Sequence, residues 1–263
     1  DDWHDTSAKN VLGVDLPAAQ APEKDGLDVL DILANHPGTG RFVAGKLCRR
    51  LLGDFPPASV VDAAAAVFTA QVAAPDQIAQ VVRTILLSPE FAATFGAKVK
   101  RPFEIVVSAM RAGGADFPFI EDDPDSDSFD WQFYLTGHSL FAWHPPNGYP
   151  DVSGAWVGTS ARVMTWRLCN WLVDVEDDNE NYRLDATAQT PAGVRSANDL
   201  VDFWIDRVFG RPLETATRQE LVDFMAQGHN PSFDLPLDTD EDTRERLQSM
   251  LGLMFLSPEF LWR

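Results

Sequence analysis

The chain has 263 residues, of which 45% are hydrophobic and 11% aromatic, so it can bury a substantial core. Its formal net charge of −19 repels nucleic-acid phosphates and anionic lipid, and we therefore expect no nucleic acid as a partner. No apolar run approaches the ~20 residues that cross a bilayer, so no transmembrane segment is expected either.

Taken in chain order, the pattern of apolar residues predicts helices nearly throughout. Residues 1–25 should be irregular, because Pro17 and Pro22 interrupt any periodicity. Helices should then cover 27–36, 41–52, 57–73, 77–87 and 99–113, and later 197–210, 212–226 and 243–256. No stretch alternates with the period of a strand, so the fold class is predicted to be all-α with little or no sheet.

An internal repeat supports this fold. Residues 41–91 and 200–260 each contain a helix, a glycine, a proline-started helix, another helix and then a Leu-Ser-Pro-Glu-Phe sequence. Serine followed by proline and an acid is typical of a helix start. We therefore predict two related three-helix units packed around a central Trp- and Pro-rich segment.

The predicted organisation is one all-α domain over residues 1–263. It consists of a helical unit at 25–114, an acidic loop and Trp-rich segment at 115–180, and a second helical unit at 196–263. The chain starts without methionine, and we expect it to be part of a longer protein whose signal segment is not in this sequence.

The Trp-rich segment is the best candidate for a site. Five of the eight tryptophans lie between Phe129 and Trp171, around a loop from Trp143 to Asp151 that two adjacent prolines hold in an irregular conformation. Rigid loops with aromatic and short polar side chains suit ligand binding. The expected ligand-binding residues are Trp143, His144, Asn147, Tyr149, Asp151 and Trp156. The competing interpretation is a connector whose aromatic residues fill the gap between helical units.

The sequence gives fewer indications of catalysis or metal binding. His144 could act as a general base beside Asp151, but hydrolase, nucleotide-binding and zinc motifs are missing. Asp123, Asp125 and Asp127 alternate like the start of a calcium loop, without its glycine and its final glutamate. Calcium is thus the one cofactor that the sequence suggests. Cys48 and Cys169 lie in apolar helical patterns and are predicted to be buried thiols.

Several stretches resemble a bacterial family catalogued as domain of unknown function 1800. They are HDTSAKNVLG (4–13), DGLDVLDILANHPGTGRFVAGKLCRRL (25–51), LLSPEF (86–91), KVKRPFEIVVSAMRA (98–112), GHSLFAWHPPNGYPD (137–151) and TSARVMTW (159–166). The resemblance is to the C-terminal half of the family. It implies a helical, exported bacterial protein, often encoded beside a sulfatase-like protein, with an N-terminal helical half that is missing here. Gly137-His138-Ser139 departs from the usual Gly-Gln-Pro, so the two histidines of this segment are peculiar to this chain.

The leading hypothesis is an exported, periplasmic or secreted protein that binds, and in one version processes, an extracellular glycan or related polymer through the loop at 143–156. The first alternative is a structural or interaction module that docks with the N-terminal half of the same precursor. The second is a metal-assisted hydrolase that uses the acidic loop.

Overall fold

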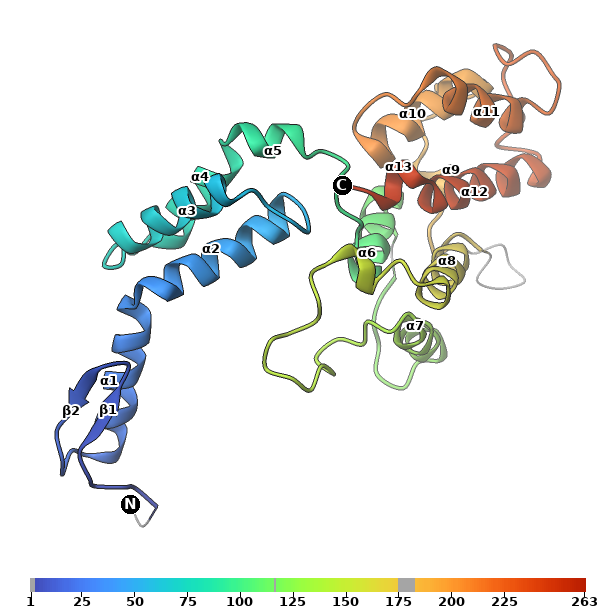
Figure 1. The fold of residues 1–263 in the computed structure, drawn as a ribbon. Helices are drawn as coiled ribbons and strands as arrows, with labels where there is room; N and C mark the ends of the chain where they lie inside the picture. The colour runs from blue at the N-terminus through green and yellow to red at the C-terminus, as the bar shows by residue number, and fades with distance from the viewer. Residues whose placement is uncertain (1–2, 116, 175–182) are drawn as a thin grey trace. The chain divides into compact units, whose positions relative to one another are not determined.

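The computed structural model describes residues 3–115, 117–174 and 183–263. Within these ranges the regular structure is thirteen α-helices, one short 3-10 helix and one hairpin of two strands (Figure 1). The all-α prediction is therefore confirmed. None of the described helices combines the length and the apolar composition that crossing a membrane requires.

Contacts between Cα atoms divide the chain into two compact parts, which we call the N-terminal body (Asp1–Phe95) and the C-terminal body (Gly96–Arg263). The N-terminal body contains a hairpin and five helices. These are β1 (Lys9–Val11), β2 (Val14–Leu16), α1 (Pro22–Asn35), α2 (Pro37–Leu51), α3 (Ala58–Ala70), α4 (Gln77–Leu86) and α5 (Pro89–Ala93).

The expectation that residues 1–25 are irregular is wrong in two places. Residues 9–16 form the antiparallel hairpin, whose turn places both Leu12 and Gly13 at positive φ, as a two-residue hairpin turn requires. Pro22, interpreted as a helix breaker, instead occupies the first turn of α1, where its missing N–H costs nothing.

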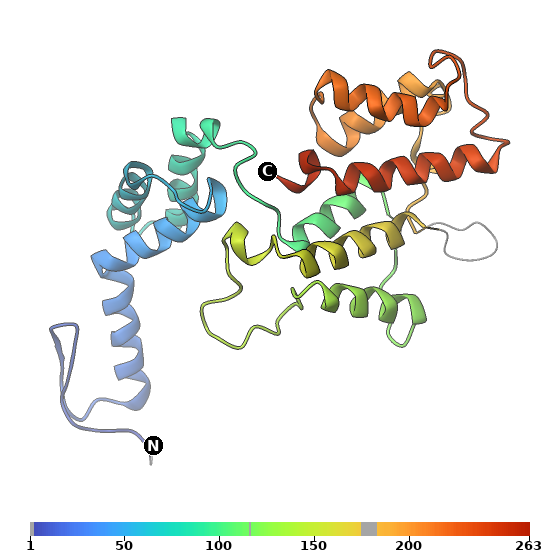
Figure 2. The same cartoon turned by 45° about the vertical axis from the view of Figure 1, so that its right-hand side comes forward.

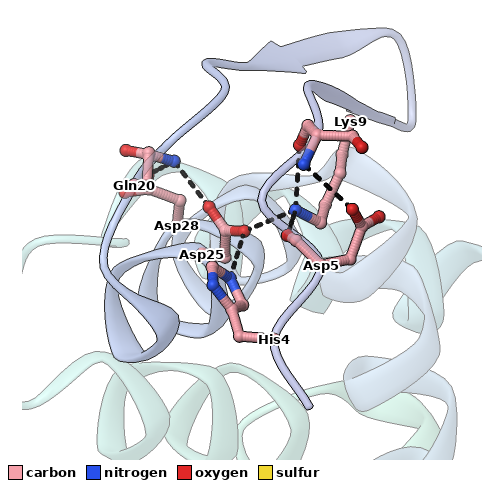
Figure 3. A network of polar contacts seen from close by, with 7 residues as sticks. His4, Asp5, Lys9, Gln20, Asp25 and Asp28 are labelled. Atoms are coloured by element: carbon pink, nitrogen blue, oxygen red, sulfur yellow. Dashed lines mark hydrogen bonds and ion pairs between the residues drawn. The ribbon is translucent and has the colours of Figure 1, made fainter. Parts of the chain in front are cut away.

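Asp25, in the first turn of α1, is the centre of a polar network that holds the first residues of the chain (Figure 3). Lys9 Nζ donates to its Oδ2 at 2.8 Å, and His4 Nε2 lies 3.0 Å from the same oxygen. Gln20 Nε2 donates to the other oxygen at 2.8 Å. The hydrogen bonds from Lys9 and then from His4 lower the pKa of Asp25 to about 2, so this buried carboxylate is ionised and fastens the hairpin to α1.

The core of the N-terminal body lies between α2, α3 and α4. Small side chains of α2, such as Ala44 and Cys48, pack against Ala64 and Phe68 of α3 and Ile85 of α4. Gly40 lets α2 approach α3 closely, because an added Cβ would lie 3.2 Å from the carbonyl oxygen of Ala65.

The C-terminal body contains nine helical elements in its described residues. These are α6 (Pro102–Gly113), α7 (Pro124–Leu135), the 3-10 helix η1 (Ser153–Ala155), α8 (Thr159–Val173), α9 (Ala186–Gln189), α10 (Ala197–Phe209), α11 (Thr215–Ala226), α12 (Glu241–Leu256) and α13 (Pro258–Leu261). Helix α8 packs against α6, α7 and α12, and these helices run in neighbouring rows (Figure 2). The main core centres on Trp204 and Phe255, and a smaller cluster around Phe133 and Leu168 joins α6, α7 and α8.

The helix at 99–113 was predicted to belong to the first helical unit. In the structure α6 packs against α8, α10 and α12, because Ile105 and Ala109 complete the apolar cluster of the C-terminal body. The division between the two bodies therefore falls at residues 95–96 rather than after residue 114. That the whole chain is one domain stays a prediction.

The internal repeat appears in the structure as the same order of elements, α2 to α5 and α10 to α13. The two serines even make the same bonds: Ser88 and Ser257 accept from the N–H of Phe91 and Phe260, at 3.2 and 3.3 Å. The hydroxyl of each serine also donates to the backbone carbonyl of the residue three positions earlier. The copies differ in burial, since Phe91 is 38% exposed and Phe260 only 2%.

Candidate binding site

A pocket of about 760 Å³ lies between α6, α7 and the segment that follows α7. Most of its wall is apolar, and much of it is aromatic. The lining residues are Phe103, Val106, Val107, Met110, Arg111, Gly114, Ala115, Phe119, Phe129, Asp130, Phe133, Ser139, Leu140 and Phe141. A concave apolar site with few polar groups is the usual form of a pocket for small molecules or for one group of a larger ligand.

Local sequence signals place the two helices that form the pocket wall. Pro102 begins α6, and the Glu104 side chain accepts from the N–H of Arg101 at 2.9 Å. Asp123 caps α7 by accepting from the N–H of Ser126 at 2.9 Å. The two phenylalanines at i and i+4 on α7, Phe129 and Phe133, then face α6 from one side of the helix.

After α7 the chain turns sharply and buries His138. Gly137 adopts φ +78°, a conformation that glycine reaches without steric cost. His138 is 4% exposed, and its Nδ1 lies 3.4 Å from the N–H of Phe103. Its ring packs near those of Phe103 and Phe133, so the histidine supports the pocket wall from behind.

The predicted site loop is irregular, as expected, and its aromatic residues pack against one another. The ring of Tyr149 lies 4.7 Å from that of His138 and 4.8 Å from that of Trp143. The Tyr149 hydroxyl donates to the carbonyl of Ser139 at 2.6 Å, and Trp143 Nε1 donates to Asn147 Oδ1 at 3.0 Å. These contacts within the loop hold its aromatic residues together.

Two further predicted ligand-binding residues serve as anchors. Trp156 is 6% exposed and donates from Nε1 to the carbonyl of Pro150 at 2.8 Å. Asp151 Oδ1 lies 3.1 Å from Nζ of Lys98, which is 3% exposed and also donates to the Asp151 carbonyl. This buried ion pair fixes the end of the loop to the segment just before α6.

The structure gives Asp151 a partner other than His144. His144 is exposed on the loop and makes no hydrogen bond or ion pair to any described residue. The Asp151 carboxylate is held by Lys98, so it does not orient the imidazole as a catalytic dyad requires. Of the predicted set, Trp143, His144 and Asn147 are thus the members at the surface.

The acidic stretch is the start of a helix rather than a calcium loop. Asp123 is the N-cap of α7, and Asp125 in the first turn pairs with the buried guanidinium of Arg183 at 2.8 Å. Asp127 lies on the exposed side of the same turn. Within the described residues no three His, Cys, Asp or Glu side chains converge to hold a metal ion.

Both cysteines are free and buried, which confirms the prediction of buried thiols. Burial raises the pKa of Cys169 to about 12, so its reactive thiolate form is negligible at neutral pH. Burial also raises the pKa of Cys48.

Sequence reasoning missed the residues that make the pocket. Phe141 lies at its edge, is fully exposed and adopts φ +61°, an uncommon backbone conformation for an aromatic residue. The charged members of the lining, Arg111 and Asp130, make no ion pair with described residues. The apolar spacing of α7 and the Phe-Pro-Phe sequence at 117–119 could have indicated this aromatic wall.

The comparisons with known proteins identify the family. The model described as "Protein of unknown function (DUF1800)" matches residues 1–262. The chain belongs to this family. No characterised protein and no solved structure matches the DUF1800 chain in the same comparisons. Because the match spans residues 1–262, the narrower expectation of a C-terminal half stays a prediction.

Proposed function

We propose that this DUF1800 chain is an exported binding protein for an extracellular glycan or related polymer. The observation that supports this proposal is the aromatic pocket of the C-terminal body. Its wall suits an apolar substituent of the polymer, such as an acyl or aryl group, because burying such a group is favoured by about 0.8 kcal/mol per CH₂.

The residues that would contact the ligand differ from those predicted at first. Phe141 and Leu140 stand at the exposed edge of the pocket, while Arg111 and Asp130 supply the charged groups for orientation. Trp143, His144 and Asn147 follow two to six residues after Phe141 and offer a partly exposed surface for the polymer itself. Tyr149, Asp151 and Trp156 hold the loop in place.

A titration with octyl glucoside below its micellar concentration tests the pocket. Calorimetry should show binding to the native chain, at least tenfold weaker binding to Phe141→Ala, and almost none to Val107→Phe, whose larger ring fills the pocket. Trp143→Ala should weaken binding of longer glycans more than binding of octyl glucoside. Phe95→Ala, an exposed phenylalanine of the N-terminal body, is the matched control. Unchanged binding to a folded Val107→Phe variant would refute the pocket assignment.

A second function is favoured by a separate observation, and we propose it as the alternative: a module that docks a helical polypeptide, such as the N-terminal half of the same precursor. The N-terminal body exposes several large apolar side chains, which a docking partner would bury. They include Leu27, Leu30, Leu33, Phe42, Phe55, Ile78, Leu87, Phe91 and Phe95.

The repeat indicates what kind of partner would cover this surface. In the C-terminal copy, Phe260 is buried by α10 and α12 and by residues 98–100, whose backbone bonds to residues 261–263. Lys100 lies over the Phe260 ring at 3.9 Å. The equivalent Phe91 has no such cover among the described residues of its own body. A partner helix preceded by a short extended segment, as in residues 98–113, would cover Phe91 in the same way.

A further inference from the structure

The outer face of α7 and the neighbouring face of α8 expose three large aromatic side chains. Trp131 is 60% exposed, Tyr134 55% and Trp166 36%. The opposite face of α7 carries Phe129 and Phe133, which already supply its contacts with the core and with the pocket. The exposed rings are therefore not needed to pack α7, and leaving them in water has a free-energy cost of its own.

Two of these rings share one orientation. Trp131 and Tyr134 are three residues apart on α7, so they lie on one side of the helix. Their rings are 17° from parallel with centroids 5.6 Å apart. This pair presents flat aromatic surface in a fixed orientation.

A groove of about 690 Å³ runs between α7 and α8, beside Trp131 and Trp166. Trp131, Trp166 and Trp171 contribute its aromatic surface, and Gln132, Arg167 and Asn170 contribute amide and guanidinium groups. Compared with the pocket on the other side of α7, the groove thus mixes ring faces with hydrogen-bonding groups.

Gln132 is the informative polar residue of this groove. The residue is only 7% exposed, but its amide atoms are not among the buried polar atoms that lack a partner in the described residues, so the amide reaches the solvent of the groove. A ligand in the groove would replace water as the hydrogen-bond partner of this amide.

This combination of groups matches the chemistry of a sugar chain. A sugar ring offers an apolar C–H face to an aromatic ring and hydroxyl groups to amides at its edge. A helical protein partner would instead favour a continuous apolar stripe, which Gln132, Arg167 and Asn170 interrupt. The net charge of −19 disfavours anionic polysaccharides.

We propose that the groove between α7 and α8 binds an uncharged polysaccharide, with its sugar rings stacked on Trp131 and Trp166 and its hydroxyl groups bonded to Gln132 and Asn170. This inference deepens the proposed function, on which it rests, by naming the class of polymer. It uses a surface separate from the pocket, so the two sites can fail independently.

Affinity electrophoresis in gels containing hydroxyethyl cellulose, soluble xylan or galactomannan tests this proposal, with polygalacturonate as the anionic comparison. At least one uncharged polymer should retard the native chain, and polygalacturonate should not. Trp131→Ala and Trp166→Ala should each lower the affinity tenfold or more, and Gln132→Leu should lower it several-fold. Trp131→Phe keeps an aromatic face and should retain most of the binding. Trp3→Ala, another exposed tryptophan, is the matched control.

The possible outcomes separate the two sites. Retardation that survives Val107→Phe but not Trp131→Ala supports the groove even if the pocket binds nothing. Absence of retardation by every uncharged polymer would overturn the inference, whatever octyl glucoside does. Self-association in light scattering that Trp131→Ala abolishes, without binding to any polymer, would assign the surface to a second copy of the chain and would also overturn it.

Discussion

At the scale of single residues, Lys100 is a cation that the C-terminal body partly buries. It is largely buried over the ring of Phe260, and burial lowers its pKa to about 8. In the unfolded chain a lysine titrates near 10.4. Between about pH 8 and pH 10 the unfolded state therefore binds more protons, and this group makes the folded state more stable as pH rises.

We predict that Lys100→Met stabilises the chain at pH 7, by up to about 3 kcal/mol, because the native chain must bury a charged ammonium there. The gain should shrink towards pH 10, where the native lysine is largely neutral. Urea unfolding of both proteins at pH 7 and pH 9.5 measures the difference. An equal difference at the two pH values would mean that Lys100 titrates normally.

Contacts between neighbouring residues were predictable from the sequence, whereas contacts between distant residues were not. The serine caps at Ser88, Ser196 and Ser257 were predictable, because a cap depends on neighbours within three or four positions. The contact of Asp151 with Lys98 was not, since 53 residues separate them and the chain contains many other acids. The burial of His138 behind the pocket wall was not predictable either, because it depends on contacts with Phe103, which lies 35 residues earlier.

At the scale of elements, the ion pair between Lys98 and Asp151 joins the loop to the start of α6. Lys98 is almost fully buried, so removing the Asp151 carboxylate takes the negative charge away from a poorly solvated ammonium. Asp151→Ala should lower the free energy of unfolding by about 3–5 kcal/mol. The double variant Lys98→Met, Asp151→Ala should recover much of this loss, because no buried charge remains.

Denaturant unfolding of the two variants tests this pair, with Glu121→Ala as a control at an exposed acid. If the double variant is no more stable than Asp151→Ala alone, the buried charge of Lys98 is not the cause of the lost stability. Octyl glucoside binding should survive in the double variant, since neither residue lines the pocket.

The helices outside residues 115–180 were predicted close to their observed positions, whereas α7 and the packing partners of the helices were not. The spacing of Ile105 and Ala109 predicts an apolar face on α6, but a one-dimensional pattern does not say which body buries that face. The acidic stretch illustrates the same limit, because Asp-Pro-Asp reads equally as a turn or as a capped helix start. The hairpin was missed because three-residue strands are too short to show alternation.

At the scale of the whole molecule, the duplicated helical unit allows a matched comparison of two equivalent phenylalanines. Phe260→Ser should cost several kcal/mol, because it removes a buried ring and introduces a hydroxyl into an apolar cluster. Phe91→Ser should cost about 1 kcal/mol or less, since the ring is already partly in water. Urea unfolding, monitored by hydrogen exchange, assigns each loss of stability to the N-terminal or the C-terminal body.

The same pair tests the docking alternative. Binding of a fluorescent dye that reports exposed apolar surface should fall in Phe91→Ser and in Leu87→Ser, without loss of folding. A loss of stability for Phe91→Ser as large as that for Phe260→Ser would show that the N-terminal face is covered and not free to dock a partner.

The unequal burial of the two copies also sets a stoichiometry. Under the docking alternative, the described copy formed by α2 to α5 is the one expected to accept a helix, because α6 and residues 98–100 already pack on the C-terminal copy. A duplicated fold usually suggests two equivalent sites, yet here a titration with a helical partner should saturate at one partner per chain. Under that alternative, the duplicated element is expected to provide one docking site instead of two.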